Sequence, residues 1–299
     1  MDVRARRLVT IAALTGVAVA LCAYVVINRI SENLPLTVAT GRACVVSAGS
    51  AAVGATGDAS EVELDAEQLA NAATITAVGL TRKVPHRGLV VALATAWQES
   101  KLENLTGGDR DSIGLFQQRP SQGWGRPEQI ADPRYAAGQF FTALLKVKGW
   151  EQMRVTDAAQ QVQRSAHPEA YEKWADESET MVNALSGEVP GAVACTVTEE
   201  SSRGPEAARS LSAGLKLDWG SVKTADVNNL VGVALKVGEK KTGWQYAHWL
   251  VAHAQERGVK RVVYGDMQWT ATSGAWAHVT ERGGIDAGPG GERVVAEVY

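Results

Sequence analysis

One glutamate at the end of a strongly apolar segment is the best-placed candidate for acid–base chemistry. Residues 85–97 are apolar nearly all round at helical spacing, which predicts a helix buried in the centre of a domain. Glu99 follows this segment directly. Burying a carboxylate as an anion is costly, which favours the protonated form that a general acid needs. The same pattern also fits a glutamate that simply reaches solvent at a helix end.

A second motif follows Glu99-Ser100 about fifteen residues later, as Gly114-Leu115-Phe116-Gln117. This order, spacing and helical setting resemble the soluble lytic transglycosylase and goose-type lysozyme group, over roughly residues 64–187. The resemblance implies an all-α, lysozyme-like domain. It also implies that Glu99 is the catalytic acid/base, that Ser100 helps to position it, and that residues 114–117 line a sugar cleft.

The reaction that the resemblance implies is cleavage of the β-1,4 bond between N-acetylmuramic acid and N-acetylglucosamine in peptidoglycan. In a lytic transglycosylase the sugar's own 6-hydroxyl attacks, so a second carboxylate is unnecessary. Hydrolysis with inversion needs a second carboxylate about 6.5–9.5 Å from the first. Asp109 and Asp111, in the loop between the two motifs, are candidates for that base. Routine turn chemistry is the alternative role of an aspartate beside glycine.

The chain departs from the family pattern in one respect. Related enzymes carry an Ala-Tyr-Asn-Ala-Gly-like motif that contributes a tyrosine near the acid, and residues 158–166 do not contain it. Gln160 and Gln163, about one helical turn apart, are candidates for polar contacts in the cleft, or else form a solvated helix face. Trp124 and Tyr135 are candidates for stacking on sugars, with core packing as the alternative.

The C-terminal residues follow a mixed pattern of strands and helices, which predicts a smaller α/β or α+β domain. Strands are expected near 230–237, 260–264 and 293–298, and a helix at 242–257. The segment resembles, more weakly, a carboxypeptidase-like cell-wall domain without its metal-binding histidines. His248 and His253 are poorly spaced for one helix face, so we expect no metal site, and we expect no cofactor.

The first thirty residues differ in composition from the remainder. Residues 8–27 are uncharged and long enough to span a bilayer, and arginines precede them. This predicts an uncleaved signal anchor in the cell membrane that passes it once, with a cytoplasmic N-terminus and an extracellular bulk. A cleaved signal peptide is the alternative. Outside the cell disulfides persist, so Cys44 and Cys195 are expected to pair across the helical domain, with two free thiols as the alternative.

The 299 residues are therefore expected to form five segments. These are the cytoplasmic tip and anchor (1–30), a linker (31–60), the lysozyme-like domain (61–195), a second linker (196–208) and the C-terminal domain (209–299). The net charge of −3 argues against nucleic acid as a partner.

The function expected from these features is that of a membrane-anchored peptidoglycan glycosidase, either a lytic transglycosylase or a muramidase. Its expected partners are glycan strands and, through residues 8–27, the lipid bilayer. The alternative is a catalytically inactive cell-wall-binding or scaffold protein that keeps a lysozyme-like fold.

Overall fold

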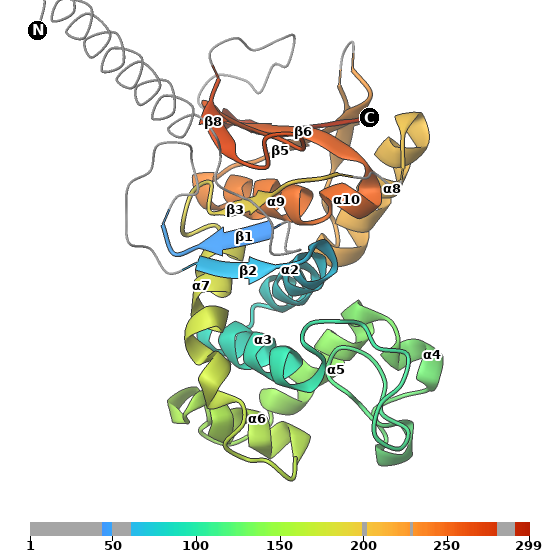
Figure 1. Cartoon of the computed structure of the whole chain (residues 1–299), viewed down its shortest axis with the longest axis vertical. Coiled ribbons are helices and arrows are strands. Elements are labelled where there is room, and N and C mark those ends of the chain that lie inside the picture. The colour runs from blue at the N-terminus through green and yellow to red at the C-terminus, as the bar shows by residue number, and fades with distance from the viewer. Residues whose placement is uncertain (1–43, 50–60, 199–201, 228–229, 280–290) are drawn as a thin grey trace, which may run out of the picture. The chain divides into compact units, whose positions relative to one another are not determined.

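Helix α3 (His86–Ser100) carries Glu99 and forms the centre of the helical part of the molecule, as its apolar sequence predicts. The computed structural model describes residues 44–49, 61–198, 202–227, 230–279 and 291–299. Every residue of α3 from Gly88 to Trp97 is buried. The helices that pack against α3 (Figure 1) are α2 (Ala66–Thr81), α5 (Pro133–Leu144), α6 (Val155–Gln163) and α7 (Ala175–Leu185).

The helix starts follow local capping chemistry. Asp65 caps α2 through a capping box with Gln68, and Asp132 caps α5, whose first residue is Pro133. The short helix α4 (Pro127–Ile130) also begins with proline. A turn at residues 168–171 and a 3-10 segment (Glu172–Trp174) come before α7.

The expectation of an all-α domain is wrong. Three strands, β1 (Cys44–Ser47), β2 (Glu61–Leu64) and β3 (Val193–Cys195), form an antiparallel sheet in the order β2-β1-β3. Exposed and buried residues alternate along β2, which is the pattern of a strand with one buried face. The strands are very short, so periodicity along the sequence carries little signal, and β1 lies in the segment that was expected to be a linker.

The same sheet explains the cysteines. Cys44 and Cys195 stand directly opposite each other in the β1–β3 register, and they form a disulfide across 151 residues. The predicted pairing is therefore confirmed. The bridge and the strands together join the two ends of the helical part.

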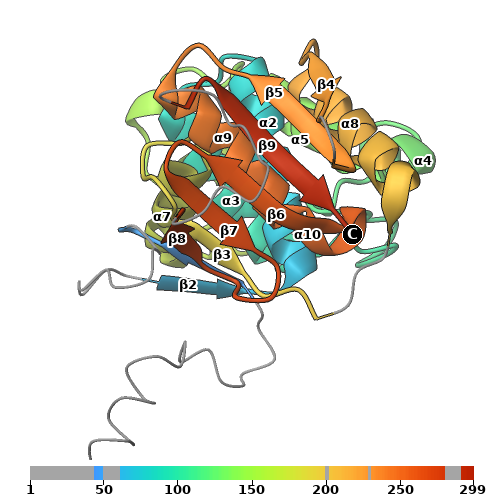
Figure 2. The ribbon, with the colours of Figure 1, turned by 90° about the horizontal axis from the view of Figure 1, so that it is seen from above.

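The C-terminal part is a six-stranded sheet with helices on one face. The strand order is β4-β5-β9-β6-β7-β8, and every neighbouring pair is antiparallel. Figure 2 shows β9 between β5 and β6, with α9 behind them. The strands are β4 (Thr224–Asp226), β5 (Gly232–Lys236), β6 (Val259–Tyr264), β7 (Met267–Thr270), β8 (Trp276–His278) and β9 (Arg293–Val298).

Three helices belong to this part: α8 (Gly204–Trp219), α9 (Lys240–Ala252) and α10 (Ala254–Arg257). Helix α8 begins inside the segment expected to be the second linker. Pro205 lies in the first turn of this helix, where a proline costs no hydrogen bond. The strands expected near 230–237, 260–264 and 293–298 are present as β5, β6 and β9.

The structure does not support the predicted single-pass membrane location. None of the helices in the described ranges has the length and apolar character that crossing a bilayer requires. The predicted span at residues 8–27 lies outside those ranges.

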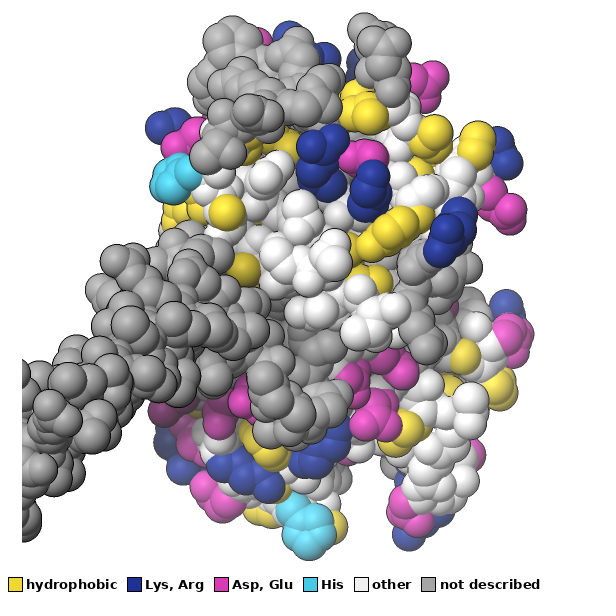
Figure 3. Space-filling view, turned by 45° about the horizontal axis from the view of Figure 1, so that its top comes forward, with side chains coloured by type: hydrophobic (Ala, Val, Ile, Leu, Met, Phe, Trp, Pro, Cys, Tyr) yellow, Lys and Arg dark blue, Asp and Glu magenta, His cyan; other side chains and the backbone are white. Residues whose placement is uncertain are grey.

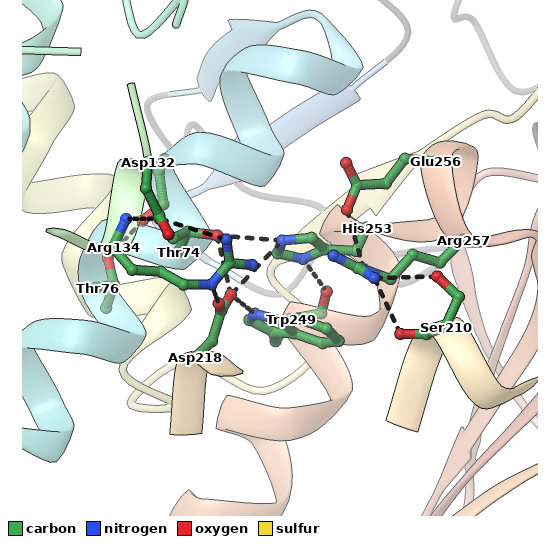
Figure 4. Close-up of polar contacts among 11 residues, drawn as sticks. Thr74, Thr76, Asp132, Arg134, Ser210, Asp218, Trp249, His253, Glu256 and Arg257 are labelled. Carbon is green, nitrogen blue, oxygen red and sulfur yellow. Dashed lines mark hydrogen bonds and ion pairs between the residues drawn. The ribbon is translucent and has the colours of Figure 1, made fainter. Parts of the chain in front are cut away.

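A buried carboxylate joins the helical part to the C-terminal part, and the described residues of both parts belong to one compact unit. Asp218 of α8 is 2 % exposed and accepts hydrogen bonds from Thr74 Oγ1 of α2 (2.9 Å) and Trp249 Nε1 of α9 (2.8 Å). Its other oxygen accepts from Arg134 Nε of α5 (Figure 4). His253 Nε2 lies 3.2 Å from the same Thr74 hydroxyl. One side chain thus connects four helices.

Replacing this carboxylate tests its importance. Asp218→Asn should lower the free energy of unfolding by about 3–5 kcal/mol, because Arg134 loses its partner and an amide donor faces other donors. Asp132→Asn is the matched control, since Asp132 also pairs with Arg134 (3.7 Å) but is half-exposed. It should cost less than about 1 kcal/mol. Urea unfolding measures both, and equal losses would contradict the role given to Asp218.

His248 is a neutral core histidine. It is fully buried in α9, its Nδ1 lies 2.8 Å from Ala184 O, and its Nε2 accepts from the Ala192 amide at 3.2 Å. A carbonyl can only accept, so Nδ1 carries the single ring proton. Burial lowers the pKa of His248 to about 4. The described residues contain no group of three His, Cys, Asp or Glu side chains that could hold a metal ion.

This burial predicts a pH dependence of stability. The unfolded chain binds a proton at His248 below about pH 6.5, whereas the folded chain does so only near pH 4. The contribution of His248 to the free energy of unfolding is complete above pH 6.5, and it falls by about 3 kcal/mol towards pH 4. The stability advantage of the unmodified protein over His248→Gln should therefore shrink as the pH falls. Urea unfolding at several pH values measures it, with His278→Gln, an exposed position, as control.

Candidate functional site

The carboxylate of Glu99 is held by a tyrosine. Glu99 is half-buried at the last turn of α3, and Tyr171 Oη donates a hydrogen bond of 2.6 Å to Glu99 Oε1. Tyr171 is fully buried and lies 72 residues further along the chain, just before the 3-10 segment. Within the described ranges no other hydrogen bond to Glu99 is found, so Oε2 is available to a ligand.

Tyr171 acts as a permanent donor. Burial raises the pKa of its phenol, and the negative charge and hydrogen bond of Glu99 raise it further. The Ser165 side chain offsets part of this shift. Because the phenol keeps its proton at neutral pH, it can donate to Oε1 of either a carboxylate or a neutral carboxyl group. When the Glu99 carboxyl group is neutral, its proton therefore lies on Oε2, the oxygen that Tyr171 does not contact.

The backbone immediately after Glu99 is strained. Lys101 (φ 59°) and Leu102 (φ 62°) both adopt the left-handed conformation, which is unfavourable for residues other than glycine. Side chains of α2 hold them there: Gln68 Nε2 donates to Lys101 O (2.9 Å) and Asn71 Nδ2 to Leu102 O (2.7 Å). Such strain is commonly found at functional sites, where the surrounding structure enforces it.

Ser100 and Gln163 attach the turn at residues 114–117 to the helices around Glu99. Ser100 Oγ is buried and lies 2.8 Å from Leu115 O and 3.0 Å from Ala96 O. From α6, Gln163 Nε2 donates to Phe116 O (2.9 Å). The structure thus brings Ser100, Gln163 and the turn together at the end of α3.

The turn itself requires its glycine. Gly114 has φ +75°, and a Cβ there would lie 2.8 Å from the carbonyl oxygen of Ile130, so a larger residue would displace the backbone. Gln117 is left-handed (φ 46°), and its side-chain amide donates back to Gly114 O at 3.1 Å. Phe116 stacks on Phe140 in the core. Of these residues, Gln117 has its side chain closest to solvent.

Two tryptophans hold the Tyr171 segment against the end of α3. Trp97 and Trp174 stack with 5.2 Å between ring centroids, and Trp174 Nε1 donates to Gln98 Oε1 (3.0 Å). Lys101 Nζ lies 4.4 Å from the Trp174 ring, and Lys173 Nζ lies 5.1 Å from it. Burial, and then the neighbouring charge of Lys173, lower the pKa of Lys101.

The two aspartates proposed as a second carboxylate differ in their surroundings. The side chain of Asp109 is 92 % exposed, and its one ion-pair partner among the described residues is Arg110, at 3.9 Å. Asp111 accepts from Arg119 Nε (2.8 Å) and from the amide and hydroxyl of Ser121 (2.8 and 3.0 Å). The Arg119 hydrogen bond and then those of Ser121 hold the pKa of Asp111 far below its usual range. Asp111 therefore stabilises its loop and is a weak base.

The remaining candidates fall into two groups. Gln160 exchanges two hydrogen bonds with the backbone of Ser165, and Tyr135 Oη donates to Trp124 O at 3.2 Å, so both contribute to local structure. Trp124 and Gln163 instead line a cavity of about 900 Å³. The second group therefore borders a space large enough for a ligand.

Tyr171 is the residue that sequence reasoning missed. A tyrosine was expected within residues 158–166, whereas the tyrosine follows in Pro168-Glu169-Ala170-Tyr171. A usable signal was the spacing of Tyr171 and Trp174, because residues three apart in a 3-10 turn lie on one side. That side meets Gln98 and Glu99.

Comparisons with known proteins give one partial match. The family model described as "VldE, C-terminal domain" matches residues 212–288, about a quarter of the chain. The matched residues run from α8 to the segment after β8 and do not include Glu99 or Tyr171. No curated protein matches the sequence.

The contact between Tyr171 and Glu99 can be tested by titration. In the unmodified protein, the Tyr171 phenol should remain protonated well above the ordinary tyrosine pKa of about 10. Glu99→Gln removes the negative charge, so the pKa of Tyr171 should fall while burial still keeps it raised. NMR of ring-labelled tyrosine, assigned with Tyr171→Phe, measures the shift. Glu151→Gln removes an exposed charge elsewhere and should leave it unchanged; a shift of equal size would contradict the direct contact.

Proposed function

We propose that the protein is a glycosidase that cleaves the β-1,4 bond between N-acetylmuramic acid and N-acetylglucosamine in peptidoglycan. The observation that carries this proposal is the hydrogen bond from Tyr171 to Oε1 of Glu99, which leaves Oε2 free at the end of a buried helix. The turn at residues 114–117 adds support, because Ser100 and Gln163 fasten it beside this carboxyl group.

The first step of the proposed reaction is proton transfer. Neutral Glu99 gives its proton from Oε2 to the bridging glycosidic oxygen, and the bond between that oxygen and the anomeric carbon breaks. Positive charge develops at the anomeric carbon and ring oxygen, while Glu99 becomes an anion. Tyr171 stabilises that anion through its hydrogen bond, which is stronger to a charged acceptor than to a neutral one.

The second step needs a nucleophile, and we propose the 6-hydroxyl of the same muramic acid unit. Its oxygen bonds to the anomeric carbon, and its proton returns to Glu99, so the enzyme ends in its starting state. Asp111 is held by Arg119 and Ser121 and is a weak base, whereas Asp109 extends into solvent. These positions favour the intramolecular route, which requires no second carboxylate, over hydrolysis with inversion.

Cleavage of isolated peptidoglycan tests the proposal. The purified full chain should release soluble muropeptides, and mass spectrometry should find products one water lighter than hydrolysis would give. Glu99→Gln should reduce the rate by at least about 100-fold, because it removes the acid but keeps an oxygen that can accept from Tyr171. Asp111→Asn should retain cleavage if the loop stays folded.

The matched control is Glu151→Gln, an exposed position that should keep full activity. Equal release by Glu99→Gln and the unmodified chain would remove Glu99 from the mechanism. Binding to peptidoglycan without any release would favour the cell-wall-binding alternative. Products with reducing ends, lost in Asp111→Asn, would instead support hydrolysis.

A further inference from the structure

The cavity lined by Trp124 and Gln163 has an unusual charge composition. It measures about 900 Å³, and its wall includes Lys146, Lys148 and Arg164 but no acidic residue among the described ones. The whole chain has a slight excess of acidic residues, with a net charge of −3. On the face shown in Figure 3, Lys and Arg side chains (dark blue) are interspersed with Asp and Glu (magenta). The charged residues of the cavity wall are therefore all positive, whereas that surface carries charges of both signs.

The three cations come from two elements that face the same space. Lys146 and Lys148 lie in the turn after α5, and Arg164 ends α6 in the left-handed conformation (φ 51°). All three are exposed, and none forms an ion pair with a carboxylate of the described residues. By contrast, the nearby Arg154 is paired with Asp157 and Glu169. The cations of the cavity thus remain available to an anionic ligand.

The rest of the wall suits a sugar. Trp124 is partly buried and offers a flat aromatic surface, while Val147, Met153 and Val162 provide apolar atoms. Glutamine side chains, Gln163 among them, supply amide donors and acceptors. An aromatic surface with a few amide groups matches a carbohydrate, which has both C–H faces and hydroxyl groups.

The cavity is joined to the proposed catalytic site through Gln163. Its side chain lines the cavity, and its Nε2 donates to the carbonyl oxygen of Phe116 in the turn at residues 114–117. The same turn is bound to Ser100, the neighbour of Glu99. The cavity wall and the surroundings of Glu99 thus both contact the turn at residues 114–117.

We infer that this cavity binds a carboxylate-bearing saccharide, with Lys146, Lys148 and Arg164 contacting the carboxylates and Trp124 contacting a sugar ring. The inference rests on the proposed function, because it assigns the charge of the substrate at the same site. It goes further by predicting that acidic glycans are selected over neutral glycans with the same backbone.

Calorimetry with two soluble saccharides tests the inference. One is a tetrasaccharide of alternating N-acetylglucosamine and N-acetylmuramic acid with free carboxylates, and the other is tetra-N-acetylglucosamine, which is neutral. The full chain carries Glu99→Gln, so that binding is measured without cleavage. The acidic saccharide should bind more tightly, and its affinity should fall with rising salt concentration.

Removing the three cations should remove the preference. Lys146→Gln, Lys148→Gln and Arg164→Gln together should weaken binding of the acidic saccharide about tenfold, as expected from three exposed ionic contacts. Binding of the neutral saccharide should change less than about twofold, because its sugar contacts are kept. The matched control is Lys216→Gln, Lys223→Gln and Lys236→Gln, which removes the same charge from exposed positions elsewhere.

Several outcomes would overturn the inference. These are an equal loss for both saccharides, a loss of the same size in the control variant, or tighter binding of inorganic phosphate than of the acidic saccharide. Thermal unfolding should show that both triple variants stay folded. Failure of the proposed function is distinguishable, since an inactive protein would still show the charge preference in these binding experiments.

Discussion

The burial of α3 is the constraint on which the rest of the structure depends. A helix that is apolar on almost every side has to be covered on every side, and α2, α5, α6 and α7 do this. The covering ends at the two ends of α3, so polar groups stand there: His86 and Arg87 at its start and Glu99 at its last turn. Glu99 is therefore placed where a carboxyl group is partly removed from water but still accessible, which is what acid–base chemistry requires.

The groups that bind and position the Glu99 carboxyl group come from distant parts of the chain. Tyr171 supplies the donor, Gln163 and Ser100 fix the turn at residues 114–117, and the Trp97–Trp174 pair holds the tyrosine in place. Each of these contacts satisfies a polar group or fills space at the end of α3. The same interactions that complete the packing of this helix thus also build the candidate site.

Much of the helical part could be predicted, because long periodic segments with caps carry strong signals. The apolar run before Glu99 and the Asp65 cap are examples, and both correspond to observed helices. The Cys44–Cys195 pairing was also predictable from the position of the two cysteines. The small sheet was not, because strands of three or four residues have almost no periodicity of their own. They form by pairing between segments that are far apart in the sequence, as in the β1–β3 register, where Cys44 stands opposite Cys195.

The candidate site was only half predictable, for a related reason. Glu99, Ser100 and residues 114–117 form recognisable local motifs, whereas Tyr171 is defined by a contact across 72 residues. Asp109 and Asp111 show the opposite problem. Their residue type fits a base, but the hydrogen bonds from Arg119 and Ser121 that decide the role of Asp111 come from a fold that the local sequence does not reveal.

The C-terminal part contributes to the site through α2, although it contains none of the candidate catalytic residues. On one side, Thr74 of α2 donates to Asp218, which also binds Trp249 of α9. One turn away on the same helix, Asn71 holds the strained backbone after Glu99 by donating to Leu102 O. A shift of α2 would weaken both contacts, since a rigid helix moves as a unit. Helix α2 therefore connects the buried Asp218 network to the left-handed residues beside Glu99. Packing of α2 against the C-terminal part thus keeps the end of α3 in place.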